Sequence, residues 1–179
     1  YMNFFKLNNY DTFVLKTEFE GAGDGLFSHN KQHLWLGHGF RSNQKAYYEI
    51  KNILDDDNLN IHTLKLIKDK WYHLDTCFCP IGHEHLLLYE SAFSEESLRK
   101  IYNVFDEKNC IKISDEDALN FACNSICIPF NKKSSNNQRY PIATIIGNKF
   151  SGKLKNKLVS LNYHIIENNM SEFLLSGGS

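Results

Sequence analysis

The sequence lacks an excess of charge of one sign, a long hydrophobic run and a secretory signal. It has 20 basic and 21 acidic residues, a net charge of −1, so electrostatics do not favour nucleic acid or an anionic membrane as a partner. Its apolar runs fall far short of the roughly 20 residues that a membrane span needs. Residues 1–13 do not place a basic region before an apolar one, as a signal peptide would.

Cysteine and proline are also sparse. An odd set of five scattered cysteines does not form a disulfide framework, so we expect reduced thiols and a cytoplasmic location. With three prolines and ten glycines the chain has no obvious linker, and 179 residues suffice for one domain. Because the sequence starts on Tyr1 and ends on "SGGS", we expect residues 1–179 to be a single domain that is a fragment of a larger one.

The pattern of apolar residues predicts alternating strands and helices. A block of strands with one helix recurs about every 45–55 residues, which favours an α/β fold of repeated ββαβ-like units over a doubly wound sheet. Ser42 is a candidate cap for the first of the helices. We expect strands at 10–19, 33–40, 61–67, 71–79, 85–90, 110–113, 125–130 and 163–168, helices at 42–56, 94–105, 114–123 and 150–162, and an exposed loop at 131–141.

The segment "FEGAGDGLF", residues 19–27, carries Glu20 and Asp24 among three glycines. Glycines allow a ligand to approach the backbone closely, and a carboxylate held there can orient a histidine or bind a cation. An ordinary turn with solvated acids is the alternative. The spacing is not that of a phosphate-binding loop, because GxGxxG is absent and two acids would repel phosphate.

The segment "HLDTCFCPIGHEH", residues 73–85, places His73 two positions before Asp75. On a strand the two side chains would share one face, and a histidine beside a carboxylate is the basic unit of acid–base catalysis near neutral pH. A zinc site is one alternative, although its cysteine spacing is unusual. Buried cysteines followed by an exposed turn are another. The zinc ligands would be Cys77, Cys79, His83 and His85.

A third segment, "GHGFRSN" at residues 37–43, carries Arg41 between a predicted strand and a predicted helix. The planar guanidinium of an arginine at a strand end can bind a carboxylate through two hydrogen bonds. This signal is weak by itself, because most arginines are solvated.

Five segments together resemble motifs of the guanidino-group-modifying, or pentein, superfamily, which includes arginine deiminase, dimethylarginine dimethylaminohydrolase and glycine amidinotransferase. They occur in family order, and the resemblance covers about residues 13–179. It implies the family fold, a five-bladed α/β propeller of ββαβ units, of which this chain would hold an incomplete set of blades. The segments are "FEGAGD", "GHGFRSN", "HLDTCF", "DALNFACNSI" and "SEFLLSGGS".

The resemblance also implies a mechanism without a metal or cofactor. A cysteine thiolate attacks the guanidinium carbon of an arginine-like substrate and forms a covalent amidino intermediate. His73 would be the catalytic acid and base, and Glu20 its orienting partner. Asp75 would bind the guanidinium, Arg41 the substrate carboxylate, and Asp24 is also assigned to substrate binding.

The substrate and reaction type stay open between an amidinohydrolase and an amidinotransferase. Asp75 favours an unsubstituted guanidinium, because methylated nitrogens offer fewer N–H donors, although the motifs are otherwise similar to those of the short dimethylarginine hydrolases. The family nucleophile follows a glycine-rich turn that "SGGS" resembles, so we expect it just beyond Ser179. Missing segments or a second chain would complete the propeller. The alternatives are a non-catalytic relative that binds an arginine-like ligand or a protein, and the zinc-binding domain.

Overall fold

The structure, a computed structural model, describes residues 1–130 and 141–176. It contains three three-stranded sheets that follow one another along the chain. In the first sheet, β1 pairs antiparallel with β2, and β2 pairs parallel with β3. The crossover between the two parallel strands carries helix α2. The elements are β1 (Gly25–Ser28), β2 (His33–His38), α2 (Ala46–Leu54) and β3 (Asn60–Lys65).

The second and third sheets repeat this order of strands and helix. Each has an antiparallel pair, then a helical crossover, then a parallel pair. The predicted repeat of ββαβ units is therefore confirmed. The second unit consists of β4 (Phe78–Ile81), β5 (His85–Leu88), α3 (Glu95–Val104) and β6 (Cys110–Lys112), and the third of β7 (Ile126–Pro129), β8 (Ala143–Gly147), α5 (Gly152–Ser160) and β9 (His164–Glu167).

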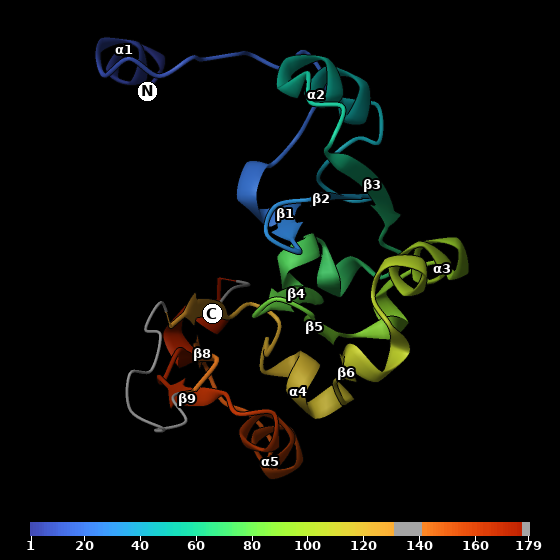
Figure 1. The fold of residues 1–179 in the computed structure, drawn as a ribbon, viewed down its shortest axis with the longest axis vertical. Helices are drawn as coiled ribbons and strands as arrows, with labels where there is room; N and C mark the ends of the chain where they lie inside the picture. The colour runs from blue at the N-terminus through green and yellow to red at the C-terminus, as the bar shows by residue number, and fades with distance from the viewer. Residues whose placement is uncertain (131–140, 177–179) are drawn as a thin grey trace.

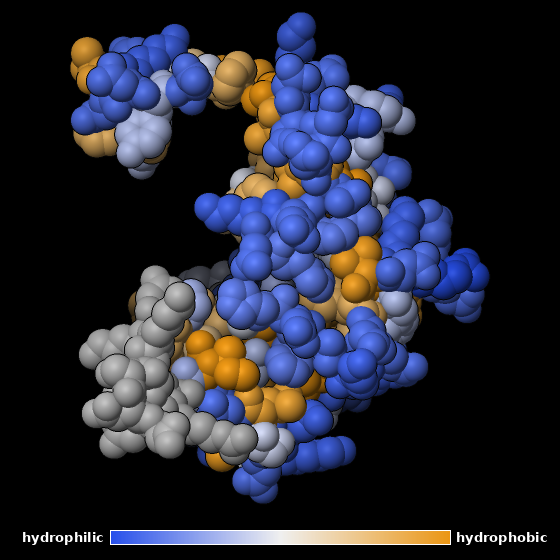
Figure 2. Space-filling model, in the orientation of Figure 1, coloured by the Kyte–Doolittle hydropathy of each residue, from blue (hydrophilic) through white to orange (hydrophobic). Residues whose placement is uncertain are grey.

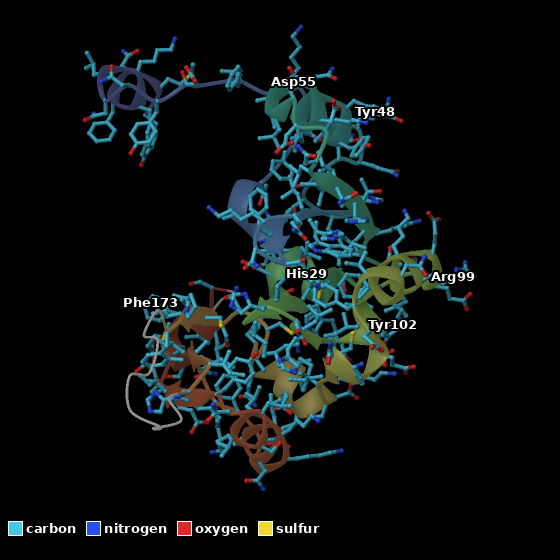
Figure 3. The ribbon with its side chains drawn as sticks, viewed as in Figure 1. His29, Tyr48, Asp55, Arg99, Tyr102 and Phe173 are labelled. Carbon is cyan, nitrogen blue, oxygen red and sulfur yellow. The ribbon has the colours of Figure 1, made fainter. Side chains whose placement is uncertain are left out.

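The three units form an arc, with α2, α3 and α5 on its outer side and the sheets on its inner side (Figure 1). The arc is open, so the described residues do not close a propeller ring. Figure 2 shows a mostly hydrophilic surface over α2 and α3. Arg99 on α3 points away from the sheets, and Phe173 lies on the opposite side of the molecule (Figure 3). None of the described helices is long and apolar enough to span a membrane.

One hydrophobic core runs through all three units. It includes Trp35 of β2, Phe78 of β4 and Ile145 of β8, which are all fully buried. A smaller cluster lies under α2 on the other face of the first sheet. Consecutive sheets therefore pack against each other through shared apolar side chains, which fixes the turns between the sheets in place.

Short helices outside the repeat complete the fold. α1 (Met2–Leu7) has no buried residue. α4 (Asp115–Leu119) is shorter than the predicted helix at 114–123, and α6 (Ser171–Leu174) was not expected. Strands β1 and β8 were also missed, because the pattern predicted no strand between residues 19 and 33 and none between the loop and α5. Residues 131–140 of the predicted loop lie outside the described part of the chain.

The prediction of a strand over residues 71–79 is wrong. The chain forms two 3₁₀ turns there, η2 (Asp69–Trp71) and η3 (Leu74–Thr76), and β4 begins only at Phe78. A local hydrogen bond stabilises the turn: the Thr76 hydroxyl donates to the His73 carbonyl at 2.7 Å, where a strand would pair with a neighbouring strand. His73 and Asp75 therefore do not share the face of a strand.

The strand expected at residues 10–19 is absent as well. The backbone N–H groups of Lys16 and Thr17 donate to the Glu49 carboxylate of α2, at 2.7 and 2.9 Å, instead of to a neighbouring strand. Ser42 does not cap α2, whose N-cap is Lys45 and has no side-chain bond. The Ser42 hydroxyl has other partners, which belong to the candidate site.

Candidate active site

Glu20 and His73 form the centre of the candidate site. Glu20 precedes η1 (Gly21–Gly23) and His73 precedes η3, and the two are 53 residues apart in sequence. The His73 Nε2–H donates to Glu20 Oε2 at 2.6 Å, with 22% of the His73 side chain and 41% of the Glu20 side chain exposed. A carboxylate in this position fixes the orientation of the imidazole and stabilises its protonated form.

The charge state of Glu20 follows from these contacts. The hydrogen bond from His73 holds the pKa of Glu20 below its ordinary value, and the nearby Arg41 guanidinium acts in the same direction. Glu20 is therefore an anion near neutral pH, as an orienting partner for a proton-transferring histidine must be.

Asp24 holds the two halves of the site together. It is fully buried, and one carboxylate oxygen accepts from the Ser42 hydroxyl at 2.6 Å while the other accepts from the Leu74 N–H at 2.9 Å. The Ser42 oxygen in turn accepts from the Glu20 N–H at 2.9 Å. Asp24 thus ties the backbone after His73 to the backbone of Glu20. Burial raises the pKa of Asp24.

Two glycines make this close packing possible. A Cβ atom at Gly37 would lie 2.7 Å from Asp24 Oδ1 and 2.8 Å from Leu74 Cβ. A Cβ atom at Gly23 would lie 3.0 Å from His73 Nδ1. Both positions let the backbone approach a site residue more closely than any other amino acid would allow.

Asp75, two residues after His73, lines a cavity of about 290 Å³, and Ala22, two residues after Glu20, lines the same cavity. The walls come from β1, from β4 and from the residues before β7, and include Phe27, Phe78 and Asn124. Burial raises the pKa of Asp75 to about 6, and the charge of His73 and a hydrogen bond from the Asn124 side chain partly offset this. A half-buried carboxylate in a partly apolar cavity is suited to pair with a cation.

Arg41 lies on the exposed side of the site. Its Nη1 is 3.5 Å from Glu20 Oε1, and its Cζ is 4.9 Å from the centre of the Tyr72 ring. The Tyr72 ring also contacts the His73 ring, with centroids 4.7 Å apart and an angle of 63° between the planes. The Arg41 side chain is 51% exposed, so its guanidinium is accessible to a ligand.

Three of the cysteines lie near the candidate site: Cys77 Sγ lies 3.8 Å from the His73 carbonyl oxygen, and Cys79 and Cys123 line the cavity of Asp75. All five are free, and four of them are buried. Burial raises the pKa of every thiol, to about 12 for Cys79 and to about 11 for Cys110. Thiols in such surroundings stay protonated near neutral pH and are poor nucleophiles.

The four residues of the zinc alternative do not converge. His83 Nδ1 lies 2.9 Å from Asn30 Oδ1, and His85 Nδ1 lies 2.9 Å from the Tyr163 hydroxyl. The two cysteines of the set are buried. Within residues 1–130 and 141–176, no group of three or more His, Cys, Asp or Glu is placed to hold a metal ion.

Sequence reasoning missed three residues of the site. Ser42 was expected to cap a helix, while Tyr72 and Asn124 were given no role. Asn124 lies within "DALNFACNSI", whose resemblance to a family motif was the only available signal. Tyr72 directly precedes "HLD", and no spacing rule marks such a residue. The predicted glycine-rich turn falls mostly at residues 177–179, outside the described part of the chain.

Comparison with solved structures identifies the class of protein. The N-terminal domain of ArgZ, a cyanobacterial arginine dihydrolase, has a TM-score of 0.84 and 36% sequence identity, and the match covers 99% of this chain and 60% of that domain. Dimethylarginine dimethylaminohydrolase of Pseudomonas aeruginosa has a TM-score of 0.69 at 22% identity and shares the fold. The chain is a member of the pentein superfamily of guanidino-group-modifying proteins, as its motifs indicated.

The family follows from a second comparison. The model of the family N,N dimethylarginine dimethylhydrolase, eukaryotic, matches residues 2–179, and the chain belongs to this family. Bifunctional arginine dihydrolase/ornithine cyclodeaminase AgrE of Nostoc sp. is 34% identical over 181 residues, which is 100% of this chain and 24% of AgrE. Dimethylarginine dimethylaminohydrolase of Mycobacterium tuberculosis is 27% identical over 160 residues, 89% of this chain and 46% of that enzyme. This chain thus spans about a quarter to a half of the length of these relatives.

Proposed function

We propose that the whole protein is a hydrolase of the guanidinium group of arginine or an arginine derivative. The observation that carries this proposal is the 2.6 Å contact between Glu20 and His73 next to the cavity that Asp75 lines. An oriented histidine and a carboxylate for a planar cation are the two parts that such a hydrolysis needs. The arginine dihydrolase activity of AgrE and ArgZ supports the same reaction class.

Asp75 is proposed to bind the substrate guanidinium. Its carboxylate can accept two parallel N–H bonds from a guanidinium, and apolar side chains such as Phe27 and Phe78 line the cavity around it. The positive charge of the substrate would lower the pKa of Asp75 and keep it ionised. Arg41 is proposed to bind the substrate carboxylate at the exposed end of the site, in exchange for its contact with Glu20.

His73 is proposed to move the protons. A cysteine thiolate adds to the guanidinium carbon, and His73 donates a proton to the nitrogen that leaves as an amine or ammonia. The neutral His73 then takes a proton from water, which attacks the amidino carbon and releases the thiolate. Glu20 stabilises the imidazolium in each step. Asp24 is proposed to act as a positioning residue, because both of its carboxylate oxygens already accept hydrogen bonds from the protein.

The nucleophile is proposed to be a cysteine outside these 179 residues, in the part of the protein that follows "SGGS". The raised pKa of all five thiols present supports this assignment. The N-terminal domain of ArgZ has been solved covalently bound to a reaction intermediate, and a cysteine-to-serine variant of it with substrate bound. Missing segments or a second chain would supply the units that close the propeller.

The test is turnover by the full-length protein. It is incubated separately with arginine, methylarginines and agmatine. Citrulline and ornithine are measured for arginine and the methylarginines, and N-carbamoylputrescine and putrescine for agmatine. We expect citrulline or ornithine from arginine, and no turnover by the His73→Ala variant. A folded full-length protein that forms none of these products from any of the substrates contradicts the proposal. Binding of arginine without turnover would instead favour the non-catalytic alternative.

A further inference from the structure

Four side chains of the site form a closed ring of contacts. Glu20 and His73 are 2.6 Å apart, and Glu20 and Arg41 are 3.5 Å apart. Tyr72 closes the ring, because the Arg41 guanidinium lies 4.9 Å above its face and the His73 imidazole packs at 4.7 Å in an edge-on arrangement. Tyr72 is thus in contact with both Arg41 and His73.

The local backbone determines where the Tyr72 ring points. The chain turns from a helical conformation at Tyr72, with φ −77° and ψ −16°, to an extended one at His73, with φ −117° and ψ 151°. The preceding residue, Trp71, is buried and packs on Tyr89 with ring centroids 4.5 Å apart. With Trp71 anchored in the core, the Tyr72 ring lies on the side of Arg41 and His73.

Arg41 needs such a support. Its side chain is long and half exposed, and the 3.5 Å contact with Glu20 is too long for a strong ion pair. Fixing a side chain of this kind costs rotamer entropy that an exposed ion pair offsets poorly. A flat aromatic face holds a guanidinium parallel to itself and leaves its N–H edges free for a carboxylate.

We propose that Tyr72 is a positioning residue whose ring orients Arg41 for the substrate carboxylate and His73 for proton transfer. The inference rests on the proposed function, and it adds a residue that has no chemical role of its own. It requires the ring rather than the hydroxyl. The effect of Tyr72 on Arg41 can be measured separately from its effect on His73, because only Arg41 is proposed to bind the substrate carboxylate.

The experiment uses the full-length enzyme with Tyr72→Phe, Tyr72→Leu and Tyr72→Met, each checked for folding by its thermal midpoint. The probes are arginine as substrate and agmatine, which lacks the carboxylate, as a competitive inhibitor. We expect Tyr72→Phe to behave like the wild type. In Tyr72→Leu and Tyr72→Met, the KM for arginine should rise about two- to fivefold through loss of the cation–π contact. The Ki of agmatine should change less than about twofold, and kcat should fall by about three- to tenfold through a looser His73.

Each other outcome is decisive. An active wild type whose Tyr72→Leu and Tyr72→Met variants keep KM and kcat overturns this inference and leaves the proposed function standing. Equal changes for arginine and agmatine, or a loss in Tyr72→Phe as large as in Tyr72→Leu, also overturn it. Failure of both aliphatic variants to fold, with Tyr72→Phe folded, would assign Tyr72 a structural role. A wild type without turnover overturns the proposed function, and this inference with it.

Discussion

Replacing Asp75 with asparagine is the most informative single change that the structure suggests. Asparagine keeps the size of the side chain and its place in the 290 Å³ cavity, but it removes the negative charge. If Asp75 binds the substrate guanidinium, the variant leaves a buried cation without its partner. Removing one member of a buried charge pair costs about 3–5 kcal/mol, so the KM for arginine should rise by a factor of about a hundred to a few thousand.

The pKa of Asp75 gives the same assay a pH dependence. Burial raises this pKa to about 6, and only the ionised carboxylate can bind the cationic substrate. In the wild type, kcat/KM should therefore fall about tenfold for each pH unit below about 6. The Asp75→Asn variant should lose this acidic limb of the profile, because it has no group to protonate.

The same substitution should stabilise the free protein. A folded-state pKa raised from 3.8 to about 6 means that Asp75 contributes most to stability when protonated, below about pH 4, and that this contribution is lost as the pH rises through 6. The shift corresponds to at most about 3 kcal/mol at 1.36 kcal/mol per unit. Urea unfolding at pH 7 should show Asp75→Asn to be more stable than the wild type, with the difference vanishing near pH 4.

Asp57→Asn is the matched control, because Asp57 is exposed and does not line the cavity. This control should change neither KM nor unfolding. An Asp75→Asn variant that binds arginine normally, or that is less stable than the wild type at pH 7, would refute the assignment of Asp75 as a desolvated guanidinium-binding carboxylate.

Two further predictions concern the support of the site. Glu20→Gln should lower kcat by about tenfold or more, because a neutral partner stabilises the His73 imidazolium less. This loss is part of the roughly 10²–10⁴-fold that acid–base catalysis typically contributes. An unchanged kcat in steady-state assays would contradict the pairing of Glu20 with His73. Gly37→Ala places a methyl group 2.7 Å from the Asp24 carboxylate and should lower the free energy of unfolding by about 1–3 kcal/mol, as measured with urea. Gly152→Ala, where a Cβ atom meets nothing within 4 Å, is the control and should not destabilise the protein.

Much of the fold could be predicted because it depends on local patterns. Strand and helix periodicity indicated the recurring block of strands with one helix and the helix of each of the three units, although β1 and β8 were missed. The secondary-structure predictions failed where contacts with residues distant in sequence override the local pattern of apolar residues. Residues 71–79 alternate like a strand, yet the buried Asp24 carboxylate binds the Leu74 N–H and the chain turns there. Nothing within residues 71–79 encodes a partner 50 positions away.

The candidate site shows the same division. The residue types for the proposed chemistry could be chosen from short motifs whose order along the chain resembles the superfamily: Glu20, His73, Asp75 and Arg41 all stand in such motifs. The folded chain was needed to show that Arg41 contacts Glu20 and that both carboxylate oxygens of Asp24 accept hydrogen bonds from the protein. It was also needed to show that Tyr72 contacts both Arg41 and His73. The reason is physical: a motif fixes the chemistry of a side chain, whereas burial and distance depend on how the first two sheets pack against each other.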